Sequence, residues 1–134
     1  MQALHPLKQT QQFLSAILKT IQTGQVDSKF GSAIETGQAM AIVKKALSLE
    51  NIELCGLHCH IGSQIFECEP FTDAAEIMIR FIKEIKDKTG YETKILNLGG
   101  GMGVRYIEED PIIDYAENIG KIAKKIVSYA EDNG

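Results

Sequence analysis

The chain has 134 residues, of which 44% are hydrophobic and 24% are charged, and its formal net charge is −4. This length suits one domain, and the apolar content is enough for a core. The negative charge argues against a protein that binds the nucleic-acid backbone and suits a small-molecule enzyme domain. No apolar run approaches the roughly 18 residues of a membrane span, and residues 1–20 lack a secretory signal, so we expect a cytoplasmic protein.

Three cysteines fit this compartment: Cys55, Cys59 and Cys68. If residues 53–59 form a strand, Cys55 and Cys59 lie about 13 Å apart along it, which is too far for a disulfide. We therefore expect reduced thiols, buried or half-buried.

The first predicted element is a helix over residues 6–21. Pro6 suits a first helical position, and the apolar residues that follow approximate a helical stripe. The polar segment from Thr23 to Ser32 is predicted to be a loop or an irregular short strand. A second helix is expected from Thr36, as N-cap, to about Leu47.

The C-terminal half of the sequence alternates between strands and helices. Residues 53–60 are predicted to form a strand, and residues 70–90 a helix that Pro70 opens and Gly90 ends. A short strand is expected over residues 93–98. Asp110 and Pro111 are then predicted to start a last helix that runs to about residue 130.

From residue 36 on, the predicted order is helix, strand, helix, strand, helix. This alternation indicates right-handed βαβ units and a parallel sheet, either open or closed into a barrel. The sequence shows two clear strands, and a third is expected near residue 20. A complete (β/α)8 barrel needs about 250 residues, so we expect an α/β fold of about three βα units with unpaired sheet edges.

Two unusual segments each follow a predicted strand directly: residues 58–64 (HCHIGSQ) and residues 97–103 (NLGGGMG). Consecutive parallel strands point the same way, so both segments are predicted to leave the sheet at its carboxyl end. Ligands bind at this edge in parallel α/β folds.

The three glycines Gly99, Gly100 and Gly101 have two interpretations. They can bring backbone N–H groups close to an anion, most commonly a phosphate, with Ser63 as a further donor from the neighbouring segment. Alternatively, they only permit a tight turn and close packing. In the first case a side chain at Gly101 would occupy the place of the phosphate.

His58 and His60 alternate along the predicted strand and are expected on the same side, with Cys59 opposite. A metal site would need a third ligand at suitable spacing, and none is present, so no metal is predicted. Two interpretations remain open, namely ordinary hydrogen-bonded histidines and a histidine that stacks on or hydrogen-bonds an aromatic ligand.

Three ordered motifs make a specific resemblance to a known family. Residues 56–64 (GLHCHIGSQ) are similar to a motif of the diaminopimelate decarboxylases, which are pyridoxal-phosphate (PLP) enzymes. Residues 96–103 resemble their second glycine loop, and residues 23–31 match a third segment in the same order. The resemblance extends from about residue 21 to the end, and it places residues 1–20 outside the family as a helical N-terminus or junction.

The resemblance implies that residues 21–134 form part of a PLP-binding (β/α)8 barrel of a homodimeric enzyme. This family converts meso-diaminopimelate to L-lysine and CO2 in lysine biosynthesis. By resemblance, His60 stacks on the cofactor ring, and Ser63, Gly99, Gly100 and Gly101 hold its phosphate. The implied partners are PLP and an amino-acid substrate, with no nucleic acid and no membrane.

The sequence also departs from the family. It contains no lysine in the family's Tyr-Ala-x-Lys-Ala context, so no catalytic residue is assigned and the chain alone is expected to be inactive. The alternatives are a segment of a related arginine, ornithine or carboxynorspermidine decarboxylase, a noncatalytic PLP-binding or regulatory fragment, an interaction fragment, and a phosphate binder for another ligand.

Overall fold

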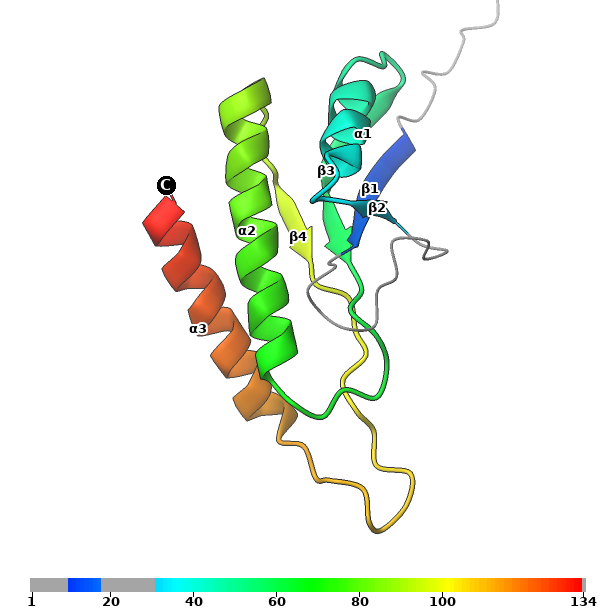
Figure 1. The fold of residues 1–134 in the computed structure, drawn as a ribbon, viewed down its shortest axis with the longest axis vertical. Coiled ribbons are helices and arrows are strands. Elements are labelled where there is room, and N and C mark those ends of the chain that lie inside the picture. The colour runs from blue at the N-terminus through cyan, green and yellow to red at the C-terminus, as the bar shows by residue number, and fades with distance from the viewer. Residues whose placement is uncertain (1–9, 18–30, 134) are drawn as a thin grey trace, which may run out of the picture.

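The computed structural model describes residues 10–17 and 31–133 and contains a parallel sheet covered by helices (Figure 1). The strands have the order β2-β1-β3-β4, and every neighbouring pair is parallel. The elements are β1 (Thr10–Ile17), β2 (Ser32–Ala33), α1 (Gln38–Leu47), β3 (Ile52–Cys59), α2 (Glu69–Thr89), β4 (Ile95–Asn97) and α3 (Tyr115–Asn133). The predicted alternation of helices and strands after residue 36 is confirmed.

The helix predicted over residues 6–21 is wrong where the structure describes it. Residues 10–17 form β1, which pairs with β3 from Thr10 opposite Ile52 to Ala16 opposite Cys59. Local apolar spacing is a weak guide when a long-range strand partner is available, because the backbone pairing decides the conformation. Of the loop expected over residues 23–32, only the last two residues are described, and Ser32 begins β2.

β3 is one of the two inner strands of the described sheet and contains an irregularity beside β1. The register shifts so that Gln12 lies opposite Leu54 and Phe13 opposite Gly56, which leaves Cys55 as the extra residue of a bulge. Because of the bulge, Leu54 shares the helix-facing side of the strand with Leu57 and Cys59.

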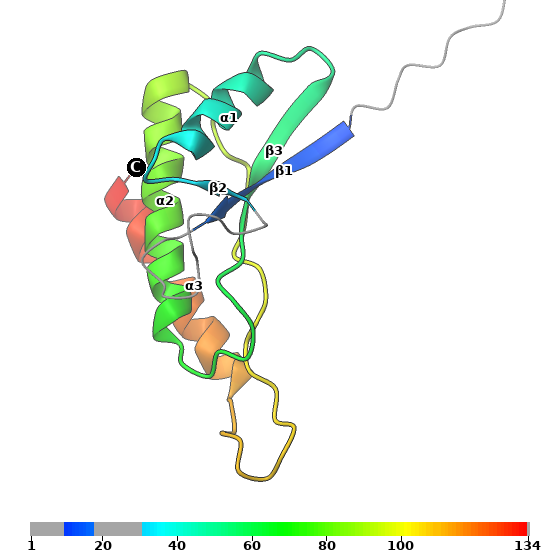
Figure 2. The same ribbon diagram turned by 45° about the vertical axis from the view of Figure 1, so that its right-hand side comes forward.

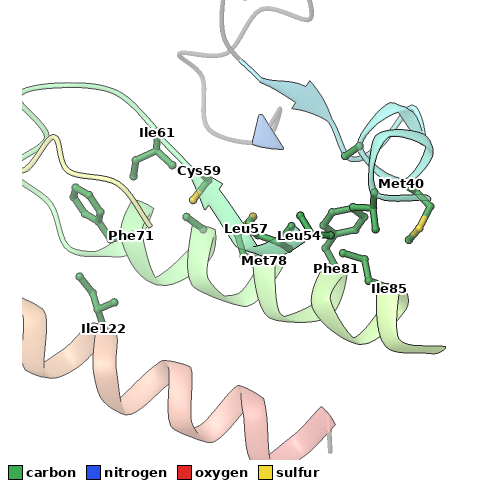
Figure 3. Close-up of a cluster of buried hydrophobic side chains, with 13 residues drawn as sticks. Met40, Leu54, Leu57, Cys59, Ile61, Phe71, Met78, Phe81, Ile85 and Ile122 are labelled. Carbon is green, nitrogen blue, oxygen red and sulfur yellow. The ribbon is translucent and has the colours of Figure 1, made fainter. Parts of the chain in front are cut away.

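The core lies between β3 and the two helices α1 and α2 (Figure 3). Leu57, Met78 and Ile85 are fully buried there, and Val43 joins them from α1. Both helices cover the same side of the sheet, as right-handed crossovers require, which is also visible in Figure 2. The predicted helix over residues 70–90 is confirmed as α2, and Gly90 ends this helix with φ 73°.

Two helix starts differ from the prediction. Gly37, not Thr36, is the N-cap of α1, and the Thr36 hydroxyl donates to the carbonyl of Ala33 instead. The last helix begins at Tyr115, after Asp114, whose carboxylate accepts the N–H of Glu117.

Asp110 does not start that helix, because its carboxylate serves a preceding turn. It accepts hydrogen bonds from the N–H groups of Tyr106 and Ile107 at 2.8 and 3.1 Å. An aspartate used in this way closes a local turn and leaves the helix to a later cap.

α3 packs mainly against α2, and only Ile122 of its apolar stripe is buried. Tyr115, Ile119 and Val127 are exposed because the sheet formed by the described residues ends at β4 and offers α3 no strand beneath it. No described helix combines the length and the apolar character that crossing a membrane requires.

The three cysteines are free, as expected, and Cys59 is fully buried. Burial raises the pKa of the Cys59 thiol from its ordinary value of 9.0 to about 11. The folded state therefore favours the neutral thiol. The contribution of the Cys59 thiol to the free energy of unfolding is complete below pH 9, and it is lost as the pH rises from about 9 towards 11.

We expect this thiol to contribute about 2 kcal/mol to the fall in unfolding free energy between pH 8 and pH 10.5. Urea unfolding at pH 8 and pH 10.5 measures the fall, and Cys59→Ala should show a smaller one. Equal falls in the two proteins would contradict the assignment.

Candidate functional site

The two segments singled out by the sequence leave the carboxyl ends of β3 and β4 and run side by side below the sheet (Figure 1). We call residues 60–66 the first loop and residues 98–104 the glycine loop. The N–H of Ile65 donates to the carbonyl of Gly101 at 3.0 Å, and the N–H of Gly103 donates to the carbonyl of Ile65 at 2.8 Å. The expectation that neighbouring parallel strands bring these segments together is confirmed.

Side chains extend this pairing at both ends. The Gln64 amide makes two hydrogen bonds with the backbone of Val104, and the Tyr115 hydroxyl donates to the carbonyl of Gly103 at 2.7 Å. The glycine loop is therefore held by the first loop on one side and by the start of α3 on the other.

Gly99 and Gly101 are required by close packing between the loops. Both have positive φ, 77° and 99°. A Cβ on Gly99 would lie 2.5 Å from the carbonyl oxygen of Cys59, and a Cβ on Gly101 would lie 1.9 Å from that of Gly62. The space that a Gly101 side chain would enter is thus filled by the first loop, which corrects the expectation that such a side chain would occupy the place of a phosphate.

Gly100 differs from both of its neighbours. A Cβ built on it meets nothing within 4 Å, so this part of the loop faces open space. The N–H of Gly99 is engaged by the Asn97 side chain at 2.8 Å, whereas the structure gives the N–H groups of Gly100 and Gly101 no acceptor among the described residues. Two consecutive backbone N–H groups without an acceptor, next to the open space at Gly100, are suited to binding an anion.

The imidazole of His60 stands next to this open space. Its Nδ1 lies 3.3 Å from the Cβ position of Gly99, and its Cε1 lies 3.5 Å from that of Gly101. His60 is exposed, so a flat ligand can approach the ring. His58 lies within β3, is half-buried, and is not brought to the glycine loop by any recorded contact.

Ser63 lies in the first loop directly after Gly62 and is exposed. The structure records no hydrogen bond from its hydroxyl to another described residue. Within residues 10–17 and 31–133, no group of three or more His, Cys, Asp or Glu side chains is arranged to hold a metal ion. The third motif, residues 23–31, lies outside the described residues except for Gly31.

Sequence reasoning missed the roles of Asn97 and Gln64. Asn97 binds the N–H two residues ahead of it, and an asparagine two residues before a glycine is a usable signal for that turn. Gln64 had no such signal, since its partner Val104 is 40 residues away in sequence.

The arrangement fits a phosphorylated ligand with a flat ring. The donors of Gly100 and Gly101 suit the phosphate, the free hydroxyl of Ser63 belongs to the adjoining loop, and the His60 ring stands beside the cradle. PLP has this combination of groups, so the residues present fit it.

Comparisons with known proteins agree with this chemistry. The sequence model of the pyridoxal-dependent decarboxylases, pyridoxal binding domain, matches residues 7–134. The diaminopimelate decarboxylase of Bacillus methanolicus is 49% identical over 111 residues, which are 81% of this chain and 26% of that protein.

Solved structures give the same result. The crystal structure of diaminopimelate decarboxylase from M. jannaschii matches with a TM-score of 0.77 at 34% identity, covering 87% of this chain and 26% of that one. The complex of that enzyme with L-lysine matches with a TM-score of 0.76, also at 34% identity, over 84% of this chain and 26% of that one.

The chain thus spans about a quarter of the length of the relatives it matches. The family match begins at residue 7, within the segment 1–20 that the resemblance left outside the family. It includes β1 and both loops of the site, and the chain therefore belongs to the pyridoxal-dependent decarboxylases, whose pyridoxal-binding domain it matches.

Proposed function

We propose that this chain supplies the phosphate-holding part of the PLP site of a diaminopimelate decarboxylase. The observation that carries the proposal is the pair of N–H groups at Gly100 and Gly101, which have no acceptor among the described residues and lie in the loop beside His60, with open space at Gly100. In this proposal these two groups bind the phosphate, the Ser63 hydroxyl adds a donor, and the His60 ring stacks on the pyridine ring. Gly99 has no donor role in this proposal, since its N–H is engaged by Asn97. Its contribution is to let the two loops pack closely.

PLP, when bound, supplies an electron sink for the carbanion that decarboxylation produces. The residues of this chain hold and orient that cofactor. The proposed reaction of the longer enzyme is the conversion of meso-diaminopimelate to L-lysine and CO2, in a homodimer. The higher identity to diaminopimelate decarboxylases, 49% for that of Bacillus methanolicus, supports this substrate class over arginine, ornithine or carboxynorspermidine. The three free cysteines support a cytoplasmic location.

We also propose that the described sheet is part of a closed (β/α)8 barrel. The outer edge of β4 has no paired strand among the described residues, and beside it an open groove of about 690 Å³ lies between β4, α2 and α3. The groove has an apolar floor that includes Ile82, Leu96 and Ile126, and the buried Thr93 hydroxyl on its wall has no hydrogen-bond partner. A further parallel strand would form backbone hydrogen bonds with the outer edge of β4, and it would bring a hydrogen-bond partner near the Thr93 hydroxyl.

A crystal structure of this segment within a polypeptide of the relatives' length tests the barrel. A strand paired to the outer edge of β4 is the expected result. An edge that remains open to solvent would contradict the proposal.

Titration of the chain with PLP tests the proposed cofactor site. We expect saturable PLP binding that inorganic phosphate weakens by competition, and much weaker binding of pyridoxal, which lacks the phosphate. Addition of meso-diaminopimelate to the loaded chain should release no CO2, since the chain lacks the family's lysine motif. Equal affinity for PLP and pyridoxal would show that the cradle does not hold the phosphate.

A further inference from the structure

Gln64 joins the two loops through a contact that the cofactor assignment does not use. Its Nε2 donates to the carbonyl of Val104 at 3.0 Å, and its Oε1 accepts the N–H of the same residue at 2.8 Å. The side-chain amide thus pairs with one backbone residue as a neighbouring strand would. They add to the backbone hydrogen bonds that Ile65 makes with Gly101 and Gly103.

The backbone of Gln64 indicates that this contact is specifically maintained. Gln64 is the one described residue other than glycine with a positive φ, 56°. Side chains with a Cβ seldom adopt this conformation, and it persists where surrounding contacts determine it. Here the double hydrogen bond to Val104 is the contact available to do so.

The position of Gln64 connects this contact to the anion cradle. Gln64 lies two residues after Gly62, whose carbonyl oxygen is the atom that a Cβ on Gly101 would meet. On the other side, Val104 lies three residues after Gly101. The pairing of Gln64 with Val104 therefore holds the two backbones together close to Gly101 and its neighbour Gly100.

We propose that Gln64 is a positioning residue for the phosphate cradle, an inference that rests on the proposed function. It touches no ligand and acts through the glycine loop, by holding the N–H groups of Gly100 and Gly101 in a fixed relation to Ser63 and His60. Gln64 is exposed and contributes nothing to the buried core. Its loss should therefore change the cradle far more than the stability of the fold.

Gln64→Asn is the sharpest variant. Asparagine keeps the amide and tolerates a positive φ, but it is one methylene too short to reach Val104. Gln38→Asn is the matched control, because the exposed Gln38 side chain also accepts a backbone N–H, that of Ala33 at 3.4 Å, outside both loops. We expect Gln64→Asn to weaken PLP binding about tenfold, as the loss of two ordinary hydrogen bonds permits, and to leave pyridoxal binding unchanged.

Amide hydrogen exchange on the ligand-free chain gives a second readout that a general loss of structure would not mimic. Exchange at Val104 should accelerate in Gln64→Asn, while exchange in α2 stays as in the wild type. Gln38→Asn should behave as the wild type in both measurements.

Two outcomes would overturn the inference: an unchanged ratio of PLP to pyridoxal affinity, which includes an equal weakening of both ligands, and unchanged exchange at Val104. If the wild type binds neither ligand, the proposed function fails for this chain. The exchange at Val104 then decides by itself whether Gln64 positions the loop.

Discussion

Replacing Gly101 by alanine should abolish measurable PLP binding and lower the free energy of unfolding by about 2 to 4 kcal/mol. The residue has φ 99°, and the new Cβ would lie 1.9 Å from the carbonyl oxygen of Gly62. Both atoms belong to backbones that the Ile65 hydrogen bonds hold together, so neither can move without breaking that pairing. Urea unfolding followed by circular dichroism, together with PLP titration, measures the two effects.

Gly100→Ala is the matched control for stability. It stands next in the chain, but its Cβ meets nothing within 4 Å, so its free energy of unfolding should stay within about 0.5 kcal/mol of the wild type. Equal destabilisation by the two substitutions would show that the loops do not pack as described.

Gly56→Ala should destabilise the fold by about 3 kcal/mol or more, at or above the upper end of the usual cost of overpacking. Gly56 lies in β3 opposite Ile95 of β4, and its Cβ would lie 2.2 Å from the carbonyl oxygen of Ile95. The short β4 would have to move away from β3. A chain of this size has a total stability of roughly 5 to 15 kcal/mol, so much of it would be lost.

Gly120→Ala, within α3, is the control for this prediction. Nothing lies within 4 Å of a Cβ at that position, and alanine favours a helix over glycine by about 0.5 to 1 kcal/mol. The urea midpoint should therefore rise slightly in Gly120→Ala and fall steeply in Gly56→Ala. A tolerated alanine at Gly56 would mean that β4 lies farther from β3.

The elements that the sequence predicted well are those whose start and end have local chemical causes. α2 begins at a proline-containing turn and ends at Gly90, and its apolar face follows the helical repeat. The N-terminal segment was predicted wrongly because its strand depends on β3, which follows about 40 residues later in the sequence. Spacing within residues 10–17 carries no information about that partner.

The candidate site was predictable in location and less so in mechanism. The sequence shows two predicted strands that run into residues 58–64 (HCHIGSQ) and residues 97–103 (NLGGGMG). This was sufficient to place both loops at the carboxyl edge of the sheet. The sequence could not predict which glycine N–H groups are left without an acceptor. This depends on the Asn97 side chain and on the contact of Gly101 with Gly62. The roles of His60, Ser63 and the three glycines towards PLP stay predictions.

The pairing of the two loops also couples the ligand to the assembly of the fold. One loop follows β3 and the other follows β4, and the whole of α2 separates them in the chain. An anion held at Gly100 and Gly101 therefore binds only the state in which this strand–helix–strand unit is complete. By mass action, a ligand bound there would shift the population of partly opened chains towards the complete unit, so the proposed cofactor site would stabilise the association of two loops that α2 separates in the chain.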